Sequence, residues 1–381
     1  MNWLIELRRD LHRIPEIAFD EHHTSRLLRN QLNRIIKTHL GREAIRSGNV
    51  EPLVHSFDNS PGFLVEYTCC DSPYRLFRAD MDALPVLEDT ACDFKSGISG
   101  MMHACGHDIH MSVLVGLIDR VLAKQPKRNL LFLFQPAEEG KGGAESVLAE
   151  GIIQQFHIEA VFALHVASNM PVGTVSSREG IFFGIPQEFD VSFNGRSAHV
   201  AFPEQGVDAI APAIDFIHLM KNDIAELAKL HRVIFHVGKI QGGNIRNVIA
   251  DQCILEGTHR SLAKEARDTM NRLIETNAKT SAAMHGAGFV TDFLCSYDPV
   301  VNAASLVSLL QKACGKLGYL YEEASVAMTG EDFGFFTSLY PGLLFWLGSG
   351  SQHPLHSPRF LPDEDCIEVG VNVMWALVEA E

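Results

Sequence analysis

Short apolar segments alternate with helical patterns through the first half of this 381-residue chain. Segments 76–79, 130–134 and 160–164 have the length and the branched or aromatic composition of buried strands. A helical pattern at about 110–123 separates the first two. Strands that alternate with helices predict a mostly parallel sheet with helices on its faces, which is an α/β fold.

The pattern changes near residues 173–184, where turn residues cluster. The next segment, 188–193, alternates apolar and polar side chains as a half-exposed antiparallel strand does. From there the order reads strand, helix (208–227), strand (233–240), strand (248–256), helix (263–284) and strand (288–297). This βαββαβ order predicts a ferredoxin-like α+β domain.

The first pattern returns after Pro299, with an amphipathic stretch at 303–317 and an apolar strand at 342–347. The α+β domain is therefore predicted to be inserted into the α/β domain. We expect residues 1–180 and 297–381 to form one discontinuous domain and residues 181–296 to form the inserted one. Two domains agree with a length above the ~250–300 residues at which single cores stop growing.

Charge and apolar content exclude several classes of partner. A formal net charge of -15 argues against nucleic acid, because phosphates would be repelled. The longest apolar runs are far shorter than the roughly 20 residues of a membrane span. Charges in the first turns do not fit a secretory signal, and eight cysteines are too sparse for a disulfide scaffold. We expect a soluble, cytoplasmic protein with no nucleic-acid or membrane partner.

Polar residues of the types that bind metals follow the three predicted strands. Asp80 and Asp82 follow the first strand, Glu138 and Glu139 follow the second, and His165 follows the third. Because the carboxyl ends of parallel strands open into one crevice, we expect these side chains to converge in space.

Residues 103–110 place three histidines, a thiol and a carboxylate within eight positions. Cys105 and His107 can both reach one site from a loop ahead of the helix predicted at 110. Thiolate with imidazole suits zinc, and imidazole with carboxylate also suits manganese, cobalt or nickel. The alternative is a loop that only caps the next helix through Asp108.

Glu138 and Glu139 lie between Pro136 and Gly140, in a stiff turn that would hold both near the strand end. Adjacent side chains can point in different directions there. One can bind a metal while the other serves as a general base. The alternative is an exposed acidic loop.

Two isolated histidines, His165 and His356, are weaker signals. A lone histidine is more often a hydrogen-bonded structural residue than a ligand. Pro354 and Pro358 flank His356 beyond the strand predicted at 342–347. A rigid loop of this kind would hold the histidine in a fixed position as a metal ligand.

Motifs along nearly the whole chain resemble those of the metal-dependent N-acyl-amino-acid amidohydrolases. This family includes hippurate hydrolase, auxin-conjugate hydrolase and N-acetyldiaminopimelate deacetylase. The C-terminal run 327–367 is most similar to the N-acetyldiaminopimelate deacetylases. The matching motifs are RRDLHRIPE from Arg8, RADMDALP from Arg78, MHACGHDIHM from Met102, QPAEEG from Gln135, ALHV from Ala163, GRSAHVAFPEQGVDAI from Gly195 and TGEDFG from Thr329.

The resemblance implies a site for two divalent metal ions, which could be zinc, manganese, cobalt or nickel. Cys105 would bridge the two ions. His107 and His165 would complete one ion's ligands, and Glu139 and His356 would complete the other's.

The resemblance also implies roles for the carboxylates around the metals. Glu138 would be the general base. Asp82 would orient a metal-binding imidazole. Asp80 stands where related carboxypeptidases have a histidine ligand, which accords with His107 having taken over that place.

The inserted domain resembles the family's lid, through which a homodimer forms. His199 would reach the neighbouring subunit's site and help to stabilise the oxyanion. Asn247 and Arg260 would hold the substrate carboxylate. Without the resemblance, His199 would be interpreted as a turn residue and Arg260 as a surface charge.

The implied function is hydrolysis of a small N-acyl amino acid, in particular N-acetyl-L,L-diaminopimelate to L,L-diaminopimelate and acetate in lysine biosynthesis. A broader aminoacylase, hippurate hydrolase or dipeptidase would use the same machinery. A catalytically silent homologue would be expected to lose a ligand or the base, and all are present. A hydrolase with Cys105 as nucleophile, paired with His107 or His103, would need no metal.

Overall fold

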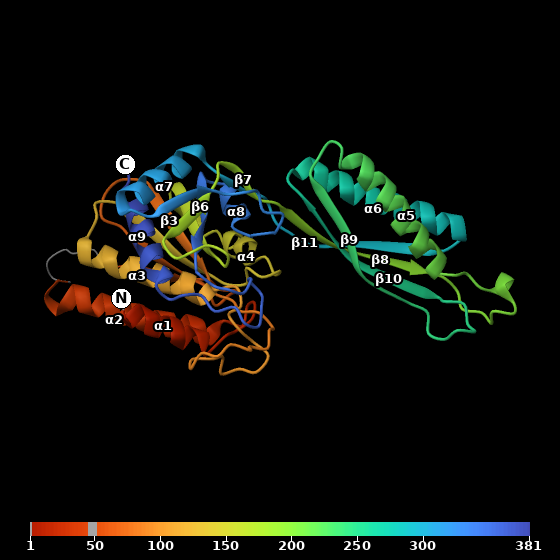
Figure 1. Ribbon diagram of the computed structural model, residues 1–381, viewed down its shortest axis with the longest axis horizontal. Coiled ribbons are helices and arrows are strands. Elements are labelled where there is room, and N and C mark those ends of the chain that lie inside the picture. The colour runs from red at the N-terminus through yellow and green to blue at the C-terminus, as the bar shows by residue number, and fades with distance from the viewer. Residues whose placement is uncertain (1, 45–51) are drawn as a thin grey trace. The chain divides into compact units, whose positions relative to one another are not determined.

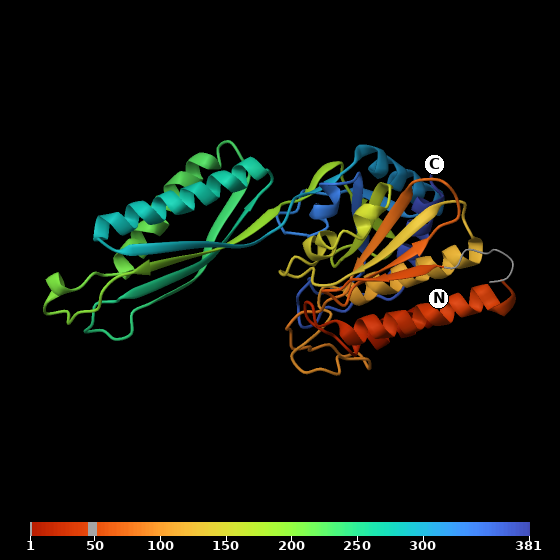
Figure 2. The same ribbon diagram turned by 180° about the vertical axis from the view of Figure 1, so that it is seen from behind.

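The computed structural model describes residues 2–44 and 52–381. The chain forms two compact units (Figures 1 and 2). Unit 1 consists of Met1–Phe182, Val300–Val326 and Asp332–Glu381, and unit 2 consists of Phe183–Pro299 and Ala327–Glu331. Unit 2 therefore interrupts the sequence of unit 1.

A mixed sheet forms the core of unit 1, in the order β1-β2-β4-β3-β5-β14-β12-β7, with β6 next to β14 and β13 next to β6. The central strands β4 (Asn129–Gln135), β3 (Tyr74–Asp80), β5 (Ile158–Ala167) and β14 (Gly342–Gly348) are parallel neighbours. β1 (Leu53–Ser56) and β2 (Phe63–Tyr67) add antiparallel pairs at one edge. The predicted α/β class is confirmed. The other strands are β6 (Thr174–Ser177), β7 (Gly180–Phe183), β12 (Val300–Asn302) and β13 (Leu320–Glu323).

Helix α3 (His107–Lys124) is buried along most of its length because it packs between the sheet and other helices. Its neighbours are α1 (Asn2–His12), α2 (His22–Ala44) and α9 (Cys366–Glu379). Gly116 lets these helices approach, since a Cβ there would lie 2.7 Å from atoms of both Leu4 and Val371. The other helices of unit 1 are α4 (Gly143–Ala149), α7 (Ala304–Leu317), α8 (Gly334–Thr337) and the short η1 (Ile153–Gln155).

Unit 2 is a four-stranded antiparallel sheet, in the order β11-β8-β10-β9, with two helices on one face (Figure 1). Side chains of Phe189, Val191 and Phe193 alternate along β8 toward the helices and are buried there. The elements are β8 (Ile185–Asn194), η2 (Pro203–Gln205), α5 (Ile210–Leu227), β9 (Val233–Gly242), β10 (Gln252–Ser261), α6 (Lys264–His285) and β11 (Gly288–Ser296).

Three of the element boundaries that differ from the prediction lie next to predicted site residues. α3 begins at His107 rather than near 110, directly after the left-handed Gly106. β5 continues to Ala167, so that His165 lies inside the strand rather than after it. β10 begins at Gln252 rather than at 248, because the backbone of residues 247–250 pairs with residues 198–209 instead.

Within residues 2–44 and 52–381, no helix combines the length and the hydropathy that crossing a bilayer requires.

Candidate metal centre

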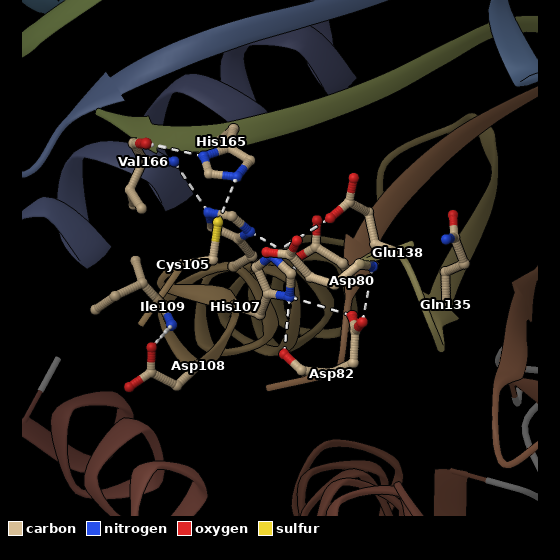
Figure 3. Close-up of polar contacts among 12 residues, drawn as sticks. Asp80, Asp82, Cys105, His107, Asp108, Ile109, Gln135, Glu138, His165 and Val166 are labelled. Carbon is tan, nitrogen blue, oxygen red and sulfur yellow. Dashed lines mark hydrogen bonds and ion pairs between the residues drawn. The ribbon is translucent and has the colours of Figure 1, made fainter. Parts of the chain in front are cut away.

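The carboxyl ends of β3, β4 and β5 lie at one edge of the sheet in unit 1, where polar side chains gather (Figure 3). Asp80 is the last residue of β3, and Asp82 follows it. Glu138 and Glu139 lie in the loop after β4. His165 is the third residue from the end of β5. These side chains come together because parallel neighbours end at the same edge.

Two groups of possible metal ligands share the thiol of Cys105. The ligand atoms of Cys105, His107 and His165 lie within 4.8 Å of one another, and those of Cys105, Glu139 and His356 do as well. The Cys105 Sγ lies 3.4 Å from His165 Nε2 and 3.2 Å from His356 Nε2. His356 Nε2 is 3.2 Å from Glu139 Oε1. All five side chains that the resemblance assigns to the metals therefore lie in one cluster.

Gly106 explains how Cys105 and His107 reach the same site. Its φ is 83°, and a Cβ at this position would lie 2.5 Å from Val166 Cγ2. Only glycine adopts this conformation readily and also fits the space. The chain thus turns between the two side chains and enters α3 at His107.

Hydrogen bonds fix which ring nitrogens face the cluster. His107 Nδ1 donates to the Asp82 carbonyl oxygen at 2.8 Å, and His165 Nδ1 donates to the Val166 carbonyl oxygen at 2.8 Å. Both imidazoles therefore direct Nε2 to the site. The buried Nε2 of His107 has no hydrogen-bond partner among the described residues. A cation would satisfy this atom, and orientation of an imidazole through its other nitrogen is typical of metal sites.

Charge at the site also favours a cation. Burial by itself lowers the pKa of His107, but Asp80 and Asp82 outweigh burial and raise this pKa to about 10. Burial raises the pKa of the Cys105 thiol well above its usual value, and the carboxylates of Glu139 and Glu138 raise it further. An excess of buried negative charge of this kind is compensated by a bound cation, whose binding displaces the protons from thiol and imidazole.

The backbone of the loop after β4 separates the two glutamates. The N–H of Glu139 donates to Asp82 Oδ2 at 2.9 Å, and the Glu139 side chain contacts His356. Glu138 is buried, and its Oε2 lies 4.0 Å from His107 Nε2. Asp82 therefore contacts both the carboxylate loop and His107, as a residue that supports ligands would.

Asp80 contacts a neighbouring histidine more closely than it contacts His107. Its Oδ1 accepts a 2.6 Å bond from His110 Nδ1 and lies 3.8 Å from His107 Nδ1. His110 Nε2 accepts the N–H of Val166 at 2.9 Å, so both of its nitrogens are used within the protein. His110 therefore holds the strand next to His165. Sequence reasoning missed this role, although the i, i+3 spacing from His107 on α3 was its signal.

Asp108 is not the N-cap residue of α3, but its Oδ1 accepts the N–H of Ile109 at 3.0 Å in the first helical turn, so the alternative interpretation of this segment is confirmed in part. The residue at the helix start is Gly106, with no side-chain cap. Asp108 Oδ2 instead lies 2.8 Å from Arg8 Nε and 2.8 Å from His12 Nδ1, and all three side chains are fully buried. Its carboxylate ties α1 to the start of α3, because a buried charge requires partners.

A buried arginine connects the ends of β3 and β4. Arg78 donates to Asp80 Oδ2 at 2.6 Å, to Gln135 Oε1 at 2.9 Å and to Asp332 Oδ1 at 2.7 Å. Asp332 Oδ2 also accepts the N–H of Ala144 at 2.8 Å, at the start of α4. Asp332 Oδ2 accepts a further bond from Gln135 Nε2 at 2.8 Å, so Asp332 contacts both ends of the loop that carries the two glutamates. Arg78 and Asp332 belong to matched motifs, but nothing in their local sequence predicts this pairing.

Arg78→Met is expected to lower the free energy of unfolding by about 3–5 kcal/mol, because it leaves two carboxylates buried without their guanidinium partner. Urea denaturation of the variant measures this loss. Arg359→Met is the matched control, since Arg359 pairs with Asp89 at 2.7 Å while both are mostly exposed. Its loss should stay within about 1 kcal/mol. Equal losses in the two variants would contradict the role of the buried network.

The remaining predicted site residues lie in unit 2. His199 and Asn247 are exposed and occupy paired loops, where the N–H of Val200 donates to the Asn247 carbonyl oxygen at 3.2 Å. Arg260 is half-buried near the other end of β10, opposite Pro186. Within unit 2, the structure brings His199 and Asn247 together and places Arg260 apart from them.

Known proteins resemble this chain along nearly its whole length. The model of "Peptidase family M20/M25/M40" matches residues 76–380. N-acetyldiaminopimelate deacetylase of Bacillus subtilis (strain 168) is 37% identical over 375 residues, covering 97% of this chain and 96% of that protein. The protein of the same name from Bacillus pumilus (strain SAFR-032) is 36% identical over 377 residues, covering 98% of this chain and 96% of its own.

Solved structures share the fold. The Bacillus subtilis YXEP protein, described as a dinuclear metal binding peptidase from the M20 family, has a TM-score of 0.82 at 29% identity, covering 99% of this chain and 97% of its own. A putative aminohydrolase from methicillin-resistant Staphylococcus aureus has a TM-score of 0.86 at 24% identity, covering 98% of this chain and 95% of its own. The chain therefore belongs to peptidase family M20/M25/M40.

Proposed function

We propose that this protein is a metal-dependent amidohydrolase that converts N-acetyl-L,L-diaminopimelate to L,L-diaminopimelate and acetate in lysine biosynthesis. The support for the reaction is the cluster in which Cys105 joins two groups of ligands beside a buried glutamate. The support for the substrate is the name shared by full-length relatives at 33–37% identity. The proposed reaction class therefore rests on the geometry of the site, and the proposed substrate rests on the similarity to these relatives.

We assign two divalent cations, zinc, manganese, cobalt or nickel, to the two ligand groups. Cys105, His107 and His165 would hold one, and Cys105, Glu139 and His356 would hold the other. Thiolate, imidazole and carboxylate are suitable donors for these ions. When bound, such a pair lowers the pKa of water and acts as a Lewis acid toward a carbonyl oxygen.

Glu138 is the general base in this proposal. Its carboxylate takes the proton of the water that adds to the acyl carbonyl carbon. As the C–N bond breaks, Glu138 returns that proton to the leaving amine. Asp82 is a positioning residue, because it contacts His107 through its carbonyl oxygen and the Glu139 backbone through its carboxylate.

We propose that unit 2 is a ferredoxin-like lid that forms a homodimer, with domain boundaries near residues 181 and 296. Its element order and its sheet order, β11-β8-β10-β9, support the fold assignment. Val200, Phe202, Ile245 and Val248 are exposed apolar residues beside His199 and Asn247, and they support an interface there. His199 would help to stabilise the oxyanion, and Asn247 with Arg260 would hold the substrate carboxylate. Because Asn247 and Arg260 lie at opposite ends of β10, the two side chains would come from different subunits of the homodimer.

A substrate panel tests the proposed function. Metal-free enzyme is loaded separately with each of the four ions, and hydrolysis of N-acetyl-L,L-diaminopimelate is compared with that of hippurate. We expect kcat/KM to favour the diaminopimelate substrate by at least about tenfold. A site that binds the charged groups at the far end of this substrate would lose those contacts with hippurate, which lacks them.

Other outcomes of the panel identify the alternatives. A preference for hippurate would indicate a broader aminoacylase. No turnover with any ion would indicate a catalytically silent homologue. Full turnover in the presence of a chelator would indicate a cysteine nucleophile, which needs no metal.

A further inference from the structure

Ala137, directly before Glu138, has an unusual backbone conformation. Its φ is 56°, in the left-handed region that a residue with a Cβ rarely adopts. Its side chain is fully buried, so the residue cannot relax toward solvent. Such a conformation costs on the order of 1–3 kcal/mol and persists only where surrounding contacts hold it.

Two hydrogen bonds hold Ala137. The N–H of Ala137 donates to Glu21 Oε1 at 2.8 Å, and its carbonyl oxygen accepts the N–H of Gly143 at 2.9 Å. Gly143 is close to this loop, since a Cβ there would lie 1.7 Å from the Pro136 carbonyl oxygen. The Gly143 bond is local, whereas Glu21 lies 116 positions earlier in the chain.

The start of α2 fixes the backbone position of Glu21. It directly precedes α2, and its carbonyl oxygen accepts the N–H of Ser25 at 2.9 Å. Glu16 accepts the N–H groups of His23 and Thr24, at 3.0 and 2.8 Å, which are free donors of the first helical turn. The Glu21 side chain is therefore not needed as a cap, and it is fully buried against Ala137.

We propose that Glu21 is a positioning residue of the hydrolytic reaction, which holds Ala137 in its left-handed conformation and thereby directs the carboxylate of Glu138 toward the site. This inference rests on the proposed function. Glu21 acts through the backbone, while Asp82 independently holds the amide of Glu139. Loss of Glu21 should therefore disturb the base more than the metal ligands.

The role requires an acceptor oxygen and not a charge. Burial, and then the carboxylate of Asp82, raise the pKa of Glu21 to about 8, so the side chain is mainly a neutral carboxylic acid at pH 7. The amide oxygen of glutamine can accept the same N–H group. Glu21→Gln is therefore a conservative variant, and Glu21→Ala removes the acceptor.

The test compares these variants for kcat, KM and metal content. We expect Glu21→Ala to lower kcat by about 10- to 100-fold, comparable to the loss of one positioned catalytic contact. KM and metal content should stay within about twofold. Glu21→Gln should restore kcat to within about threefold of wild type.

Asn129→Ala is the matched control. Asn129 is buried at the opposite end of β4, where its side chain holds the backbone of Cys69, Cys70 and Ser72. It should lower stability without changing kcat per folded molecule. The inference would be overturned if Glu21→Ala left kcat unchanged or lowered metal content and turnover in parallel. It would also be overturned if Glu21→Gln were as slow as Glu21→Ala.

A double-mutant cycle tests the contact without any turnover assay. Ala137→Gly removes the left-handed penalty, so Glu21→Ala should lower the urea midpoint less in that background than in wild type. Additive effects would overturn the inference. Should wild type hydrolyse no N-acyl amino acid, the proposed function fails, whereas the cycle still reports on the contact.

Discussion

Glu138→Gln is expected to keep its metal ions and to lose turnover by about 10³-fold, within the range of general acid–base contributions. Glutamine has nearly the same shape but cannot accept a proton at neutral pH. The five proposed metal ligands do not include Glu138, and its Oε2 lies 4.0 Å from His107 Nε2. Single-turnover kinetics and elemental analysis measure the two quantities on the same sample.

Glu145→Gln is the control for this variant. Glu145 is exposed in the first turn of α4, shortly after the same loop, and its substitution should leave kcat near wild type. Near-normal turnover in Glu138→Gln would disprove its role as the base. Loss of metal in that variant would make Glu138 a ligand instead.

Cys105→Ala should lose metal as well as turnover. Its Sγ is the only atom that both ligand groups share among the described residues, so each group would retain two side chains. We expect metal content after dialysis to fall to about half of wild type or lower, since weaker changes around metal sites already cost 10- to 100-fold in affinity. Excess metal should restore part of the turnover.

Cys314→Ala is the control for Cys105→Ala, because it removes a buried thiol that is not a proposed metal ligand. Cys314 is fully buried in α7, within the core of the same unit. Its substitution leaves a small cavity, which should lower stability but leave metal content unchanged. Full metal content in Cys105→Ala would remove the bridging thiolate from the proposal.

Local patterns were sufficient to predict the strands that position the site. β3 and β4 are continuous buried runs, and parallel neighbours must end at one edge. The spacing of Cys105 and His107 indicated a common site. This spacing did not predict the start of α3, because the left-handed turn at Gly106 involves a single residue and leaves no periodic pattern in the sequence.

The amino-acid sequence by itself determined the α/β class, the order of the elements and the residue types at the edge of the sheet, because strand and helix periodicity are local properties. Only the tertiary structure decided that Asp80 bonds to His110, that Arg78 joins Asp80 to Asp332, and that Glu21 holds Ala137. These contacts join segments far apart in the chain. Their partners are selected by packing and by the need to satisfy buried polar groups, which no single segment encodes.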